Sequence, residues 1–161
     1  MAMPDTQLRS SGLVLRSDHG RRYILLIRRK LGEQVVHVLP GGTPREGETL
    51  AACARREVLE ETGLIVTPNR CAFLLETIDP AGARTVDAVF LVAGETGDAP
   101  TQLEPELQPL FVALTDLGEL GMLPPIAGYL RGLGHRMRPP SIPFLGNLWR
   151  PQDPEPDVSD A

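Results

Sequence analysis

Residues 41–64 read GGTPREGETLAACARREVLEETGL and combine a bent, glycine-containing loop with one short helix that is rich in glutamate. Gly47 keeps the first part of this stretch in a loop that ordinary side chains resist, so a helix begins only after it. Thr49 has the side chain of a helix N-cap, and Gly63 is the residue type at which helices end in a left-handed turn. The stretch therefore predicts a helix of roughly thirteen residues that ends at Thr62.

Three glutamates share one edge of this predicted helix, because Glu57, Glu60 and Glu61 are spaced i, i+3 and i+4. An apolar stripe lies beside them and predicts half-buried acids that face a groove; it is formed by Leu50, Ala51, Ala54 and Val58. Like charges so placed repel unless a cation neutralises them, and carboxylate oxygens suit Mg²⁺ or Mn²⁺. A solvated acidic helix face is the alternative, and the triad alone does not choose between the two.

The spacing around the triad resembles a complete Nudix box, the signature of hydrolases that cleave nucleoside diphosphates linked to another moiety. The residues that carry the resemblance are Gly42, Glu48, Arg56-Glu57-Val58, Glu60-Glu61 and Gly63-Leu64. So many fixed residue types at set intervals make the match highly specific. The resemblance implies metal-assisted attack of water on phosphorus.

The same resemblance implies a role for each acid of the box. Glu57 and Glu61 are the expected metal ligands, joined by Glu60, with Mg²⁺ or Mn²⁺ as the cofactor. Arg56 is expected to orient the glutamates and Glu48 to assist from the loop. Structural alternatives are a helical ion pair between Arg56 and Glu60, and support of the loop by Glu48 through backbone N–H groups.

The general base and the substrate contacts are less constrained, because Nudix proteins take the base either from the box helix or from a distant loop. Glu104 and Glu106, which precede the last predicted strand, are candidates beside the box acids, and both could equally be solvated loop acids. Arg28 is a candidate for binding phosphate oxygens, and we place Gly41 and Gly42 with it among the candidate substrate-binding residues.

The expected substrate is a nucleoside diphosphate derivative: ADP-ribose, a nucleotide sugar or a modified nucleoside triphosphate. Pro80 lies where family members active on ADP-ribose resemble one another in having proline, although a turn favours proline in any case. The alternative is a non-catalytic module with the same fold that senses a nucleotide or binds a protein.

Composition narrows the class of protein. A chain of 161 residues predicts one domain, and the 42% hydrophobic and 23% charged residues are ordinary for a globular protein. The net charge of -5 argues against nucleic-acid binding through a basic surface. No membrane span or leader is indicated, and the two cysteines indicate a reducing compartment, so we expect a cytoplasmic protein.

Apolar segments on either side of the box predict a sheet flanked by two helices. The expected strands are 9–16, 22–28, 34–39, 71–78, 85–93 and 110–114, with a second helix over 126–133. A Ser-Asp-His-Gly turn and an Asp-Pro-Ala-Gly turn predict two hairpins. The order favours an α+β fold, similar to the Nudix α/β/α sandwich with a mixed sheet.

The chain is expected to divide into a Nudix hydrolase domain, residues 1–134, and a proline-rich C-terminal segment, residues 135–161. Four apolar side chains in the second part predict that it packs, either on the domain or on a second subunit of a homodimer; they are Ile142, Phe144, Leu148 and Trp149.

Overall fold

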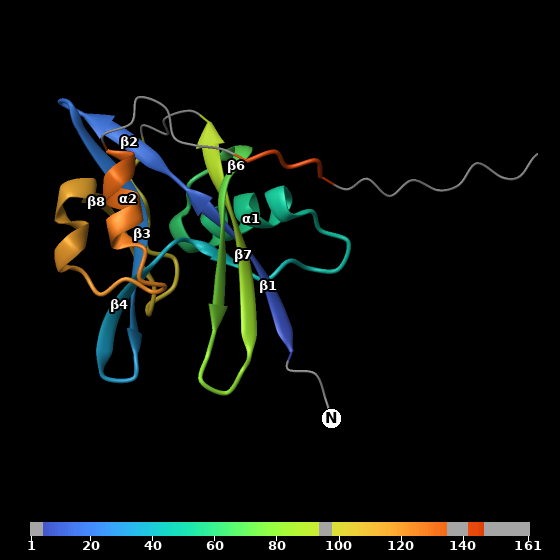
Figure 1. Cartoon of the computed structure of the whole chain (residues 1–161). Coiled ribbons are helices and arrows are strands. Elements are labelled where there is room, and N and C mark those ends of the chain that lie inside the picture. The colour runs from blue at the N-terminus through green and yellow to red at the C-terminus, as the bar shows by residue number, and fades with distance from the viewer. Residues whose placement is uncertain (1–4, 94–97, 135–141, 147–161) are drawn as a thin grey trace, which may run out of the picture.

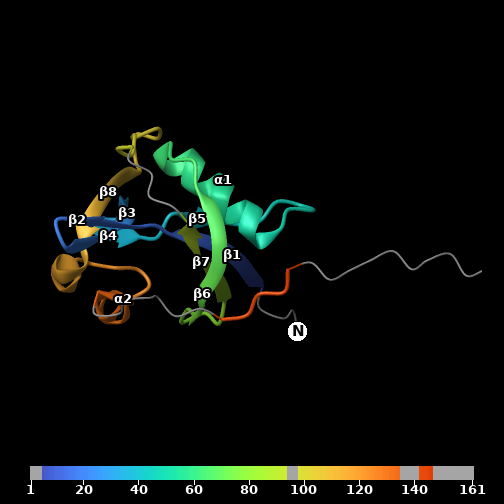
Figure 2. The same ribbon diagram turned by 90° about the horizontal axis from the view of Figure 1, so that it is seen from above.

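The computed structural model describes residues 5–93, 98–134 and 142–146 of the chain. Two four-stranded sheets lie between two α-helices (Figures 1 and 2). The strands are β1 Thr6–Leu13, β2 Leu15–Asp18, β3 Arg21–Leu31, β4 Gln34–Val38, β5 Gly41–Gly42, β6 Thr67–Ile78, β7 Arg84–Ala93 and β8 Gln108–Ala113. The helices are α1 Leu50–Thr62, a 3₁₀ helix η1 Leu114–Glu119 and α2 Ala127–Leu133.

The first sheet has the order β5-β1-β7-β6, and the second joins β2, β3 and β4 with β8 on the other edge of β3. β1 and β7 run parallel, with Thr6 opposite Arg84 and Leu13 opposite Leu91. The β6–β7 and β2–β3 pairs are antiparallel hairpins, as predicted. The first sheet is therefore mixed, and the α+β class with helices on two sides is confirmed (Figure 2).

The single strand predicted over residues 9–16 is wrong, because the chain breaks at Val14 into β1 and β2. Leu13 and Val14 are both buried, and they belong to different apolar clusters. Consecutive side chains of a strand point to opposite faces, so one strand that is buried on both sides can pass from one sheet to the other here. Leu13 of β1 shares an apolar cluster with Ile24 and Leu26 of β3.

Helix α1 begins and ends where the sequence predicts. The side chain of Thr49 accepts a hydrogen bond from the Ala52 N–H, and Gly63 adopts a left-handed conformation with φ 73°. One face of α1 packs on the first sheet; its fully buried residues are Cys53, Ala54, Val58 and Thr62. Glu57 and Glu61 lie beside this buried face and are themselves partly buried, whereas Glu60 is exposed.

Helix α2 lies on the other side of the strands from α1, next to η1 (Figure 2). Pro124 and Pro125 precede α2, which starts at Ala127, one residue after the predicted start. Leu130 and Leu133 of α2 enter a core between the two sheets, together with Leu13 and Leu26.

The described part of the C-terminal segment packs on the domain. Ile142 donates its backbone N–H to the carbonyl of Cys71 on the edge strand β6, at 2.9 Å. The ring of Phe144 meets the ring of Phe90 edge to face, with centroids 5.0 Å apart. Two further apolar residues, Leu148 and Trp149, lie outside the described residues, and for them packing stays a prediction.

Candidate active site

The glycine pair before the box loop brings the backbone against the acids of α1. Gly41 and Gly42 form β5, which pairs with Ser10 and Ser11 of β1. A β-carbon on Gly42 would lie 2.3 Å from Oε1 of Glu57, closer than non-bonded atoms approach. Glycine at this position thus lets the Glu57 carboxylate lie directly over the loop.

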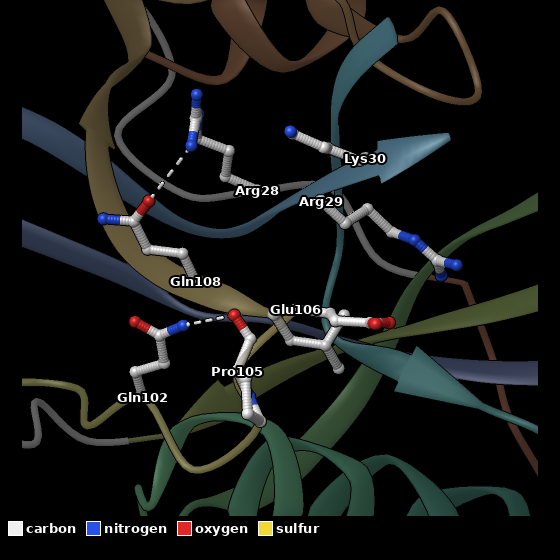
Figure 3. A pocket seen from close by; sticks show the side chains of 8 residues that line it. Arg28, Arg29, Lys30, Gln102, Pro105, Glu106 and Gln108 are labelled. Carbon is white, nitrogen blue, oxygen red and sulfur yellow. Dashed lines mark hydrogen bonds between the residues drawn. The ribbon is translucent and has the colours of Figure 1, made fainter. Parts of the chain in front are cut away.

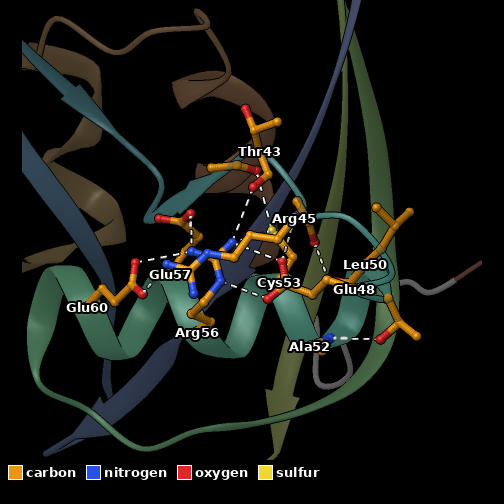
Figure 4. Close-up of polar contacts among 12 residues, drawn as sticks. Thr43, Arg45, Glu48, Leu50, Ala52, Cys53, Arg56, Glu57 and Glu60 are labelled. Carbon is orange, nitrogen blue, oxygen red and sulfur yellow. Dashed lines mark hydrogen bonds and ion pairs between the residues drawn. The ribbon is translucent and has the colours of Figure 1, made fainter.

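Arg56 holds three of the acids and the loop together (Figure 4). Its guanidinium makes two hydrogen bonds to Glu48, at 2.7 and 3.0 Å, and also contacts Glu57 at 2.7 Å and Glu60 at 3.1 Å. A further N–H bonds to the carbonyl of Thr43 at 3.2 Å. The side chain of Arg56 is only 16% exposed, so these contacts are partly shielded from water. The i,i+4 ion pair with Glu60 is present, and the same guanidinium contacts Glu48 and Glu57, which is compatible with the predicted orienting role.

Glu48 binds the backbone of the box loop in addition to the side chain of Arg56. Its carboxylate accepts a hydrogen bond from the backbone N–H of Arg45 at 2.9 Å. The hydrogen bonds from Arg56, followed by the one from Arg45, lower the pKa of Glu48 from 4.5 to about 2. The carboxylate therefore stays ionised through the acid range.

Glu61 lies in a different environment from the other acids, on the side of α1 that faces Gly41. The backbone N–H of Gly41 donates a hydrogen bond to its carboxyl group. Burial, then the nearby charge of Glu57, raises the pKa of Glu61 to about 8, and the hydrogen bond and Arg9 oppose this only in part. The positive charge of Arg9 therefore does not outweigh burial and the charge of Glu57 at this carboxyl group.

Within residues 5–93, 98–134 and 142–146, no three His, Cys, Asp or Glu side chains are arranged as a ligand set for a metal ion. Arg56 explains the arrangement, since it lies between Glu48, Glu57 and Glu60 and draws their oxygens toward itself. The donor chemistry nevertheless fits a hard cation. Carboxylate oxygens from one helical edge are available, and Glu61 is held next to Glu57 without a positive partner strong enough to ionise it.

Acid titration tests the link between Glu48 and Arg56. The folded-state pKa of about 2 lies below the ordinary 4.5, so this carboxylate stabilises the fold above pH 4.5 and loses that contribution as the pH falls toward 2. We expect Glu48→Gln to lower the urea midpoint at pH 6 and to approach the wild-type midpoint at pH 3. Glu46→Gln, at an exposed loop position, serves as the control and should follow the wild type at every pH. A constant difference between Glu48→Gln and the wild type would contradict the assignment.

Gly42→Ala tests the close approach of the loop to Glu57. The added methyl group would displace the end of a flexible side chain, so the fold should lose no more than about 1 kcal/mol. Displacing the Glu57 carboxylate should lower kcat/KM at least about tenfold in any reaction that uses the site. Gly132→Ala on α2, where a β-carbon meets nothing within 4 Å, is the matched control. Equal activity in the two variants would show that Glu57 does not need this position.

The candidate residues outside the box, two for the general base and one for substrate binding, lie in two different places. The charge of Glu104 raises the pKa of Glu61, so Glu104 lies within electrostatic reach of the box acids. Glu106 instead lines a cavity of about 430 Å³ with Arg28, Arg29 and Lys30 (Figure 3). Arg28 bonds to Gln108 at 3.4 Å in this cavity. Arg28 thus lies in the cavity with Glu106, whereas Glu104 acts electrostatically on Glu61 of the predicted catalytic helix.

Sequence reasoning missed three polar residues on β1 and β7, the two strands that follow β5 in the first sheet. Ser11 donates a hydrogen bond to Asp87 at 2.7 Å, and Arg9 lies 3.7 Å from the same carboxylate oxygen. Asp87 is the only charged residue of the apolar segment VDAVFLV, and its residue surface is 8% exposed. The signal available in the sequence was a single acid, Asp87, within an apolar strand. It does not identify Ser11 and Arg9 as the partners of that acid.

Comparison with known proteins identifies the family. The model of the NUDIX domain matches residues 6–131, which is most of the chain. A MutT protein from Methanosarcina mazei Go1 is 23% identical with a TM-score of 0.63, covering 84% of this chain and 95% of that one. The MutT NUDIX hydrolase of Burkholderia pseudomallei is 26% identical with a TM-score of 0.55, covering 69% and 85%. The NUDIX domain of Shewanella oneidensis NrtR, solved with ADP ribose, is 17% identical with a TM-score of 0.61, covering 73% and 79%.

The mixed sheet, the glycine loop and the glutamate-bearing helix α1 lie within the residues that match the NUDIX domain. This chain belongs to the Nudix family, as the box resemblance predicts. None of the helices in the described residues is long and apolar enough to cross a membrane.

Proposed function

We propose that this protein hydrolyses a diphosphate linkage in a nucleoside diphosphate derivative, with Mg²⁺ or Mn²⁺ held by Glu57, Glu60 and Glu61. The observation that carries the proposal is the edge of α1, where these acids meet Arg56 and the Gly41–Gly42 backbone. When bound, the cation supplies positive charge against the diphosphate and lowers the pKa of a coordinated water. The protein side chains around the acids hold the carboxylates in place.

Arg56 fixes the carboxylate of Glu57 through a 2.7 Å hydrogen bond, and Gly41 fixes that of Glu61. Preorganised acids of this kind do not have to reorient during the reaction, which lowers the barrier. Water attacks one phosphorus and the P–O–P bond breaks, so that ADP-ribose would yield AMP and ribose 5-phosphate. A modified nucleoside triphosphate would yield the monophosphate and pyrophosphate.

Among the two loop acids, we assign the proton-accepting role to Glu104, because its charge reaches Glu61 whereas Glu106 faces the cavity of Arg28. Glu104→Gln should lower kcat about a hundredfold or more with little change in KM. Glu106→Gln is the matched variant and should leave kcat within about twofold of the wild type. If Glu106→Gln lost more kcat than Glu104→Gln, the base would be Glu106. If both variants kept the wild-type kcat, the base would lie on the box helix.

The substrate class is proposed on two supports: the ADP ribose seen with a structural neighbour, and the family's nucleotide chemistry. The test incubates the protein with ADP-ribose, a nucleotide sugar and an oxidised nucleoside triphosphate, with Mg²⁺ or with EDTA, and measures nucleoside monophosphate by chromatography. Nucleoside monophosphate that forms from one substrate class in Mg²⁺, but not in EDTA, supports the proposal. A protein that binds these nucleotides and forms no product would be a sensing or binding module instead.

A further inference from the structure

Residues 142–146 belong to the C-terminal segment and lie outside the part of the chain that matches the NUDIX domain. They run past the edge strand β6 toward the start of α1 (Figure 1). The N–H of Ile142 donates its hydrogen bond to the carbonyl of Cys71 on β6. The ring of Phe144 packs edge to face on the ring of Phe90 on β7. The segment therefore joins the family domain beside the helix that carries the box acids.

Both of these contacts reach one apolar cluster, on which the first turn of α1 rests. Cys71 and Phe90 belong to this cluster, and Leu50 and Ala51 of α1 pack against it. Phe90 is only 2% exposed, so it is fixed by its neighbours on every side. Because buried side chains are close-packed, a shift of Phe90 is felt at the residues packed against the same cluster. Phe144 can therefore act on the start of α1 through Phe90.

The segment also shares a cavity with the box loop. This cavity has a volume of about 430 Å³ and is separate from the one that Glu106 lines. Pro44 and residues 47–50 line it from the box loop and the start of α1, and Phe144 lines it from the C-terminal segment. Among these loop residues is Glu48, which Arg56 binds. Removing the Phe144 ring would widen the cavity and leave the box loop with fewer packing contacts.

Pro143, between the two contact residues, suits the segment to this position. Proline has no backbone N–H, so the segment cannot extend the sheet beyond β6 through residue 143. Its ring also fixes the φ angle, which reduces the conformational freedom that the segment loses when it packs. The sequence Ile142-Pro143-Phe144 therefore provides one backbone hydrogen bond and one aromatic ring without forming a strand.

We propose that Phe144 is a positioning residue for the box loop: through Phe90 and the shared cavity, it holds the first turn of α1 and Glu48 in place. For catalysis the inference rests on the proposed function, because Arg56 binds both Glu48 and Glu57 and so passes the position of the loop to a box acid. The order of the loop itself depends on neither substrate nor metal. The two consequences are therefore measured separately.

The first measurement is amide hydrogen exchange by NMR, on the whole chain with Phe144→Ala and in EDTA. The reporters are hydrogen-bonded amides of the box loop and the helix start: Glu48, Ala52 and Cys53. Their exchange should become at least about threefold faster, because one aromatic pair no longer opposes local opening. The amide of Leu130 on α2 is also hydrogen-bonded and should keep its wild-type rate.

Two further variants separate position from general stability. Leu145→Ala shortens the neighbouring side chain, which is 75% exposed, and should leave every rate unchanged. Phe144→Tyr keeps the ring, and at a position that is 42% exposed its hydroxyl group can reach water, so it should restore the wild-type rates. Equal rates in Phe144→Ala and the wild type would overturn the inference. So would an equal acceleration at Leu130, because that would show a loss of global stability.

The second measurement is turnover of ADP-ribose in Mg²⁺. Phe144→Ala should lower kcat about threefold or more and leave KM within about twofold, because a misplaced acid affects the transition state more than binding. Leu145→Ala should match the wild type in both constants. Faster exchange in the box loop with an unchanged kcat would overturn the catalytic part of the inference. A wild type that forms no product from ADP-ribose would count against the proposed substrate class, and the exchange rates would still decide whether Phe144 positions the loop.

Discussion

Glu61→Gln is expected to lose at least about a hundredfold in turnover and, at the same time, to be more stable than the wild type in EDTA at pH 8. Glu61 has a pKa of about 8 in the folded protein, because it is buried next to Glu57. In the unfolded chain the same group titrates near 4.5, so unfolding releases a proton between these values. Wild-type stability should therefore fall as the pH rises from 4.5 to 8, by an amount on the order of 4 kcal/mol.

The neutral glutamine cannot release that proton, so its variant should lack this part of the pH dependence. Urea unfolding at pH 5, 6.5 and 8 in EDTA measures the effect, and added Mg²⁺ should restore stability at pH 8 to the wild type more than to the variant. Glu46→Gln makes the same chemical change at an exposed box position and should match the wild type in both respects. An active Glu61→Gln enzyme, or one with the wild-type pH profile of stability, would refute the role given to this acid.

Local chemistry explains why the sequence predicted α1 correctly. Thr49 and Gly63 act within one turn of the helix ends, so neither needs a distant partner. The edge shared by Glu57, Glu60 and Glu61 follows from helical spacing alone. The family resemblance added the expected chemistry, and the NUDIX match over residues 6–131 confirms the family.

Long-range pairing explains what the sequence left open. Apolar segments predict strands, but nothing in residues 6–13 specifies that they pair in parallel with residues 84–91. The crossing at Val14 depends on two cores that exist only in the folded chain. For the same reason, Asp87 was visible as a charged residue in an apolar strand, while its partner Ser11 lies 76 positions away.

Arg56→Ala is expected to be the most destabilising change in the site. It would leave Glu48, Glu57 and Glu60 close together without the guanidinium that now bonds to all three. Removing one partner from a shielded charge cluster costs about 3 kcal/mol or more, and repulsion between the acids adds to it. Arg55→Ala removes the same side chain from the exposed neighbouring position and should cost less than about 0.5 kcal/mol.

Divalent cations should reverse part of this loss, because they supply the positive charge that the variant lacks. We expect millimolar Mg²⁺ to raise the urea midpoint of Arg56→Ala more than that of Arg55→Ala, since the freed carboxylates can then bind the ion. Arg56→Lys keeps one positive charge but lacks the planar fork that makes two bonds to Glu48 and reaches Glu57. It should recover some stability in EDTA while kcat stays low, because charge alone does not orient Glu57. If Arg56→Ala were as stable as Arg55→Ala in EDTA, Arg56 would not hold the acids of this site together.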